Sequence, residues 1–216
     1  MSYPRYTGGA SNQTSFAPLP MLEYKEIVYI EPLRAGARLW HSDDGALIFG
    51  LAARVRFGFR AKDGVRLTGM QTRHDAIEGG VSAEWRPSEW SFGVDYFTDG
   101  SDVNDGRSFR LSIFRQLMDS EHWDVGTYLD FDHIDSRIAR YYFGVRANEA
   151  TATRPVYQPD ATTNSSFGFS GAYKLNKTYA ILFSSEVGVL GTSAAKSPIV
   201  QQRTGFISYF GLGLVF

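Results

Sequence analysis

Apolar side chains recur at every second position through much of this chain. The last thirteen residues, 204–216, show the pattern most clearly, with one face formed by Phe206, Ser208, Phe210, Leu212, Leu214 and Phe216. A period of two is that of a β-strand, whose successive side chains point to opposite faces. The opposite face carries Gly205, Gly211 and Gly213, where a strand of a soluble protein normally presents polar side chains to water. A strand that is apolar on one face and small on the other is typical of a barrel wall in lipid.

The same alternation predicts ten strands. They cover roughly residues 21–31, 34–42, 45–58, 77–86, 89–98, 107–117, 121–132, 166–175, 178–190 and 204–216. Short turns follow the second, fourth, sixth and eighth strands, and the longer connections are 59–76, 99–106, 133–165 and 191–203. Tight turns at one end and long loops at the other are the arrangement of an outer-membrane barrel, with periplasmic turns and extracellular loops. The sequence therefore predicts one all-β domain over residues 1–216, an antiparallel up-and-down transmembrane β-barrel, with residues 1–20 as an N-terminal segment.

Charged residues stay almost wholly on the face opposite the apolar one. An Arg or Lys on the lipid face costs about 2–4 kcal/mol at the bilayer midplane. We therefore expect a set of charged side chains to face the lumen: Arg34, Arg38, Arg54, Arg56, Arg60, Glu78, Glu84, Asp95, Arg110, Asp124, Asp130, Asp132, Lys174 and Glu186. Arg115 is an exception near a strand end, where the same cost falls to roughly 0–1 kcal/mol. Either register of residues 22–28 puts a charge on the apolar face, so we expect a bulge or a shorter strand there.

Aromatic side chains gather near the predicted turns. We expect a girdle at the periplasmic interface, formed by Trp85, Trp90, Trp123, Tyr173, Tyr179 and Phe216. An upper ring would consist of Tyr96, Phe109, Phe131 and Phe167. The alternative is a soluble sandwich or lipocalin-like barrel, in which these aromatics form an ordinary core.

Composition excludes several classes of protein. A net charge of −1 without a basic run argues against a nucleic-acid partner, and the absence of cysteine excludes disulfides and thiolate metal sites. No run of 18 apolar residues indicates a transmembrane helix. The start, Met1-Ser-Tyr-Pro-Arg, lacks the apolar core of a secretory signal, which an outer-membrane protein needs. We therefore expect a removed signal or a truncated N-terminus.

Several short motifs resemble, in order, those of one known family. They are Tyr3–Gly8, Pro18–Pro20 with Tyr24, Gly58–Arg60, Leu67–Met70, the run Tyr142, Phe143, Gly144, Val145, and the run Ser197, Pro198, Ile199, Val200. Together the motifs resemble the MipA/OmpV family, the MltA-interacting proteins of Gram-negative outer membranes. The resemblance implies a barrel in the cell outer membrane that acts as a scaffold for a murein lytic transglycosylase and a bifunctional penicillin-binding protein. Family members usually carry an additional early strand, which would give twelve strands in an intact protein.

Residues with catalytic or metal-binding potential are few. His41, His74, His122 and His133 show no ligand spacing, so we expect neither a metal nor a cofactor. Asp130, Asp132, His133 and Asp135 form the one cluster that resembles acid–base machinery, and we interpret it as a solvated, charged rim. We accordingly expect no catalytic residues and no enzyme activity.

Two questions stay open at this level. The lumen charges are either ion pairs that brace the interior or a polarised eyelet that selects solutes. Residues 142–145 and 197–200 lie in long loops that carry function, or each continues a strand or covers the lumen; residues 140–143 alternate as a strand extension above the membrane would. The alternatives to the scaffold are thus a narrow channel for small polar solutes or antibiotics, and an adhesin or sensor that acts through its loops.

Overall fold

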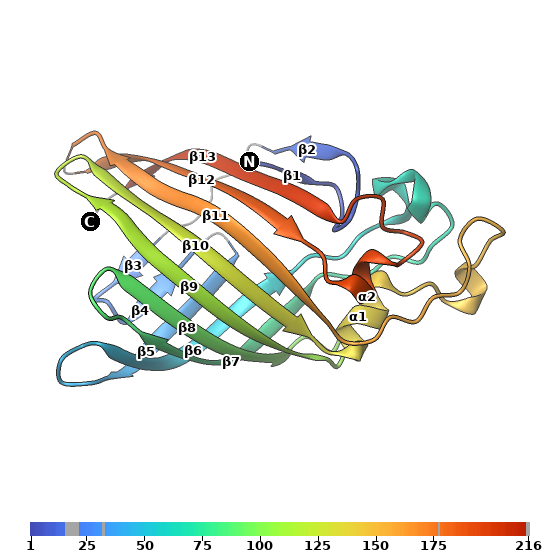
Figure 1. Ribbon diagram of the computed structural model, residues 1–216, viewed down its shortest axis with the longest axis horizontal. Coiled ribbons are helices and arrows are strands. Elements are labelled where there is room, and N and C mark those ends of the chain that lie inside the picture. Colours follow the sequence, from blue (N-terminus) through green and yellow to red (C-terminus); the bar gives the residue numbers. More distant parts are fainter. Residues whose placement is uncertain (16–21, 32, 177, 215–216) are drawn as a thin grey trace.

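The protein is a single antiparallel β-sheet that curls into a barrel (Figure 1). The computed structural model describes residues 1–15, 22–31, 33–176 and 178–214. Nine strands of 8 to 13 residues form most of the wall: β5 (Arg34–His41), β6 (Leu47–Arg56), β7 (Ala76–Trp85), β8 (Trp90–Asp99), β9 (Arg107–Asp119), β10 (Trp123–Ile134), β11 (Thr162–Lys174), β12 (Tyr179–Val189) and β13 (Thr204–Leu214). Each strand pairs with its neighbour in sequence. The predicted all-β, up-and-down architecture is confirmed.

The two ends of the barrel differ as the loop lengths predict. We call the end with the short connections after β5, β7, β9 and β11 the turn end, and the opposite end the loop end (Figure 1). The turns are held by local hydrogen bonds, for example from the backbone N–H of Ala46 to the Asp44 carboxylate at 3.0 Å. Gly45 between them has a φ of +70°, which a glycine adopts without strain.

The N-terminal part of the sheet departs from the prediction. Four strands of three residues each flank the long ones: β1 (Ser2–Pro4), β2 (Asn12–Thr14), β3 (Leu22–Tyr24) and β4 (Val28–Ile30). The sheet therefore has thirteen strands in the described residues, in the order β2-β1-β13 and down to β3, rather than about ten. The predicted strand 21–31 is split because Lys25 and Glu26, with φ of 52° and 56°, form an exposed turn that keeps both charges off the apolar face.

Large apolar side chains cover the outside of the barrel. In β13, Phe210 and Leu212 are 73% and 69% exposed, and Leu51 in β6 is 51% exposed. Phe49 on β6 is similarly exposed, and such positions recur on other long strands, among them Ile77, Val81, Val94, Phe109, Phe167 and Val187. An apolar surface that continues around the whole wall suits acyl chains and not water. The soluble-core alternative is wrong, because the apolar side chains are outside.

A compact core forms at the loop end instead. The connections there contain α1 (Ser136–Phe143), α2 (Thr192–Ala195) and the short helices η1 (Ala61–Asp63), η2 (Val65–Leu67) and η3 (Ala147–Glu149) (Figure 1). Their apolar residues make two buried clusters, one around Ile138 and Phe143 and one around Leu67 and Ile199. We call these folded connections the cap. Among the described residues, no helix has the length and hydropathy needed to cross a membrane.

Candidate functional site

Charged side chains of four strands meet inside the barrel near the loop end. In β6, Arg54 and Arg56 each contact Glu78 of β7 at 2.6 Å and Asp132 of β10 at 2.8 and 3.1 Å, respectively. Arg54 also donates to Ser108 of β9 at 2.9 Å. Because β6 and β10 are not neighbours in the sheet, side chains that join them lie on its concave face. We call Arg54, Arg56, Glu78, Asp132 and Ser108 the lumen network.

Further contacts link strands deeper in the barrel. Arg34 of β5 pairs with Asp95 of β8 at 2.8 Å, and Arg110 of β9 pairs with Asp130 of β10 at 2.7 Å. The arginine in each of these pairs donates a charge-assisted hydrogen bond to the carboxylate. The Arg34–Asp95 pair therefore links strands that are not neighbours in the sheet, whereas the Arg110–Asp130 pair joins adjacent strands on the inner face.

The remaining lumen candidates lie at other levels. Near the turn end, the Glu84 carboxylate accepts bonds from Arg86 at 2.8 Å and from the Ser91 hydroxyl, and Asp124 accepts from Gln116 at 2.8 Å. Three further predicted lumen residues are also described. Arg38 donates to the Glu26 carbonyl at 2.9 Å, Glu186 accepts from the Tyr128 hydroxyl at 3.0 Å, and Lys174 is half-buried on the last residue of β11. Arg60 differs, because it follows the end of β6 and is exposed at the start of η1.

Aromatic side chains form contacts at the level of the turn end. Trp85 and Trp90 both stack on Phe92, with ring centroids 5.5 and 6.0 Å away, and Trp123 lies 4.7 Å from Tyr173. Tyr179, beside the next turn, is 43% exposed, and Phe216 lies outside the described residues. Arg115, the exception on the lipid face, sits 5.0 Å over the Trp90 ring, so its charge is held at this level by a cation–π contact.

A buried ion pair that the sequence analysis did not identify holds the cap together. Arg73 donates two parallel bonds to the Glu149 carboxylate, at 2.8 and 2.7 Å, and the two side chains are 0% and 1% exposed. Burial raises the pKa of the Glu149 carboxyl, but Arg73 and the backbone N–H groups of Arg146 and Gln71 outweigh it, and the pKa falls to about 2. The sequence signal for this site is weak, since Arg146 and Glu149 have only the spacing of a capping box.

The family-like motifs converge in the same cap. The Tyr6 hydroxyl donates to the Ile199 carbonyl at 2.8 Å, and the Ser197 hydroxyl donates to the Phe143 carbonyl at 2.5 Å. Val145 packs with Tyr6 and Ile199 in one buried cluster, together with Phe59, Leu67 and Met70. These motifs therefore specify how the cap is packed. The segment Pro18–Pro20 lies outside the described residues.

Residues 140–143 belong to a helix, so the alternative of a strand extension is wrong. The Asp135 carboxylate accepts the backbone N–H groups of Arg137 and Ile138, both at 3.0 Å, and this starts α1. Ile138, Ala139, Tyr142 and Phe143 are buried, which is the spacing of one helix face. Tyr142 and Phe143, which suggested the alternation of a strand in the sequence, are buried on that face of the helix.

The four residues that resemble an acid–base cluster in the sequence, interpreted above as a solvated rim, each have a separate partner. Asp130 and Asp132 pair with arginines, His133 contacts the Thr163 hydroxyl at 3.0 Å, and Asp135 caps α1. Within the described residues, no group of three or more His, Asp or Glu side chains is placed to hold a metal ion.

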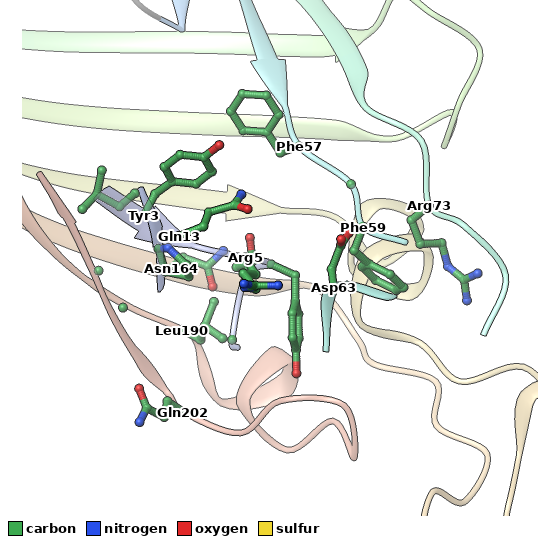
Figure 2. Close-up of a pocket in the computed structure, with 18 of the residues that line it drawn as sticks. Tyr3, Arg5, Gln13, Phe57, Phe59, Asp63, Arg73, Asn164, Leu190 and Gln202 are labelled. Carbon is green, nitrogen blue, oxygen red and sulfur yellow. The ribbon is translucent and has the colours of Figure 1, made fainter. Parts of the chain in front are cut away.

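A cavity of about 890 Å³ opens at the loop end beside the lumen network (Figure 2). The N-terminal segment lines it with Tyr3, Arg5 and Gln13, and the connection between β6 and β7 contributes residues 57–60, 62–63 and 72–75. The rest of the wall comes from the inner faces of β10 to β13, including Asp130, Asn164 and Glu186, and from the connection between β12 and β13, including Arg203. Pockets that bind small molecules have volumes of about 300–1,000 Å³, so this cavity is in the usual range.

Comparison with known proteins gives a consistent result. The family model described as MltA-interacting protein MipA matches residues 1–216. Outer membrane protein Omp26La of Vibrio anguillarum is 27% identical over 139 residues, which cover 64% of this chain and 54% of that protein. Outer membrane protein OmpV of Vibrio cholerae serotype O1 is 26% identical, with the same coverage of both chains. The matched stretch thus spans about half the length of these relatives.

Proposed function

This chain belongs to the MltA-interacting protein MipA family of outer-membrane proteins, and from that membership we propose that it is a scaffold for murein remodelling. In this role the barrel anchors a murein lytic transglycosylase and a penicillin-binding protein at the inner surface of the outer membrane. The observation that carries the proposal is the family match over residues 1–216, because the family's description names an interaction with MltA. The proposed role includes no catalytic step in the barrel itself.

The turn end is the surface that this role requires. In a barrel of this topology the short turns face the periplasm, where murein lies. The exposed acidic residues there are Asp43, Asp44, Glu89, Asp119 and Glu121. The exposed cations at the same end include Arg86, which is paired with Glu84 at 2.8 Å, and Arg115, which lies over the Trp90 ring, so the acidic residues outnumber them in the described part of the chain. This excess of negative charge supports docking of a partner with a basic surface, since complementary charge steers association.

Ion pairs across the lumen also support a scaffold. The lumen network joins β6, β7, β9 and β10, and the Arg34–Asp95 pair joins β5 to β8. The sheet has thirteen strands in the described residues, more than the roughly eight of a barrel that its side chains fill, so these contacts obstruct the lumen without filling it. Where the ion pairs cross the interior they hinder passage, which favours a role for the surfaces at the ends of the barrel.

A pull-down with a purified MltA-type lytic transglycosylase tests the scaffold. The variant Asp119→Lys with Glu121→Lys reverses two charges at the turn end, and Asp160→Lys, on an exposed loop-end residue, is the matched control. We expect capture by the parent and the control, and reduced capture by the double variant that weakens further with salt. No capture by the parent barrel, while it migrates as a folded protein on unheated gels, would rule the scaffold out.

The narrow channel remains the second candidate, and the cavity at the loop end is the observation that favours it. Conductance in planar bilayers separates the two functions. Currents at background level are expected for the scaffold, whereas discrete, salt-dependent openings would support the channel.

A further inference from the structure

The cavity at the loop end carries opposite charges on different parts of its wall. Glu186 of β12 and Asp130 of β10 supply carboxylates from the strands, where both side chains are at least partly buried. Arg5, Arg60 and Arg203 are exposed and belong to the segments around the opening. Lys62 adds a fourth cation near the opening, where Asp63 and Asp75 are the acidic residues of the lining. The wall is therefore acidic within the barrel and carries more cations than carboxylates toward the solvent.

Several of these charges lack an ionic partner in the described part of the chain. Asp130 is paired with Arg110, but no ion pair among the described residues involves Glu186, Arg5, Arg60 or Arg203. Glu186 accepts a hydrogen bond from the Tyr128 hydroxyl at 3.0 Å, which is a neutral donor. Arg203 uses its Nε to donate to the Leu190 carbonyl at 2.9 Å, which fixes the guanidinium at the cavity wall. Charges placed in this way without partners are suited to a ligand that brings both signs.

We propose that this cavity binds a small zwitterion, of the chemical class of short unblocked peptides. Its ammonium group lies near Glu186 and Asp130, and its carboxylate lies near Arg203 and Arg5. A guanidinium matches the planar geometry of a carboxylate, and a carboxylate accepts the donors of an ammonium group. The site goes beyond the scaffold role and does not depend on it, because it lies at the end of the barrel opposite the turns.

Isothermal titration calorimetry on the folded, detergent-solubilised chain tests the proposal with trialanine as the probe. N-acetyl-trialanine lacks the ammonium group and trialanine amide lacks the carboxylate. We expect trialanine to bind with a dissociation constant in the millimolar range or below, and each blocked peptide to bind about tenfold more weakly.

Two variants assign the ends of the ligand. Glu186→Gln keeps an acceptor for Tyr128 and removes the charge, so it should weaken trialanine by about tenfold and leave N-acetyl-trialanine unchanged. Arg203→Gln should weaken trialanine by a similar factor and leave trialanine amide unchanged. Glu84→Gln and Arg86→Gln, at the turn end and outside the cavity, are the matched controls and should bind like the parent.

Each outcome either supports or overturns the proposed zwitterion site. Selective loss in the two cavity variants, with folding verified by gel mobility before and after heating, supports the site. Absence of trialanine binding to the parent protein overturns it. Equal binding of blocked and unblocked peptides, or equal loss in the control variants, also overturns it, since charge at this cavity would then not be what recognises the ligand.

Discussion

The Arg73–Glu149 pair gives the sharpest prediction about stability, because it is isolated from water and holds two loops together. Glu149→Gln keeps the shape of the side chain but removes its charge and one acceptor oxygen. Arg73 retains its bonds to the carbonyls of Tyr141 and Gln71, at 2.7 and 3.0 Å, but its guanidinium stays buried without a counter-charge. Removing one partner of a buried ion pair typically costs about 3–5 kcal/mol.

The lowered pKa of Glu149 gives a magnitude for all the contacts that favour its charged form, from Arg73 and from the backbone N–H groups of Arg146 and Gln71. It falls from 4.5 to about 2 in the folded cap, which corresponds to about 3 kcal/mol at 1.36 kcal/mol per pKa unit. Because the folded pKa is the lower one, this stabilisation is complete above pH 4.5 and is lost as the pH falls toward 2. We therefore expect the cap of the parent protein to loosen in that acid window, and the cap of Glu149→Gln to show little further change there.

Hydrogen–deuterium exchange measured by mass spectrometry reports on the cap separately from the barrel wall. A loss of about 3 kcal/mol raises the population of open cap about a hundredfold, so peptides covering residues 65–75 and 136–157 should lose their protection. Peptides from β11 to β13 should be unaffected. Asp160→Asn is the control, because its partner Arg140 is 3.9 Å away and both side chains are exposed. A change below about fivefold in Glu149→Gln, the size expected of an exposed pair, would refute the argument.

Two other predictions concern the wall and the cap. Leu51→Arg, on the exposed apolar face of β6, should destabilise the barrel in bilayers by about 2–4 kcal/mol. Met118→Arg, next to the turn end of β9, should cost only roughly 0–1 kcal/mol. Denaturant unfolding from vesicles measures both free energies, and equal costs would contradict the assigned depths. Gly58→Ala should destabilise the cap by about 1–3 kcal/mol, because its new Cβ would lie 1.9 Å from the Arg73 carbonyl oxygen. The new Cβ of Gly79→Ala would have no atom within 4 Å, so this variant is the control. Proteolysis of the cap should be faster in Gly58→Ala only, and an unchanged cleavage rate would show that the backbone at Gly58 can move.

The strands could be predicted because lipid imposes a simple rule on each of them. Phe49 and Leu51 must face outward and Arg54 inward, so a period of two marks both the strand and its register. The short N-terminal strands were missed because three residues are too few to show a period. Lys25 and Glu26 did indicate an interruption, but not that the chain turns back there.

The cap could not be derived from periodicity. Its packing depends on contacts between residues far apart in sequence, such as Tyr6 with Ile199 and Arg73 with Glu149. Asp135 is a recognisable N-cap, but the alternation of Arg140 to Phe143 also suits a strand, and only tertiary packing decides between them. Asp130 and Glu186 were predicted to face the lumen, but Arg5 and Arg203 were not identified as site residues, because their place at the cavity depends on how the N-terminal segment and the last connection lie against the barrel.

The central claim is that apolar side chains face acyl chains while small and charged ones face the interior. Spin labels at single cysteines along β13 test it directly, because the chain has no native cysteine. In a bilayer, oxygen should reach labels at positions 206, 210 and 212 more readily than labels at 207, 209 and 211, so accessibility alternates with a period of two. Uniform accessibility along the strand, or alternation in the opposite phase, would contradict the barrel orientation and every functional assignment built on it.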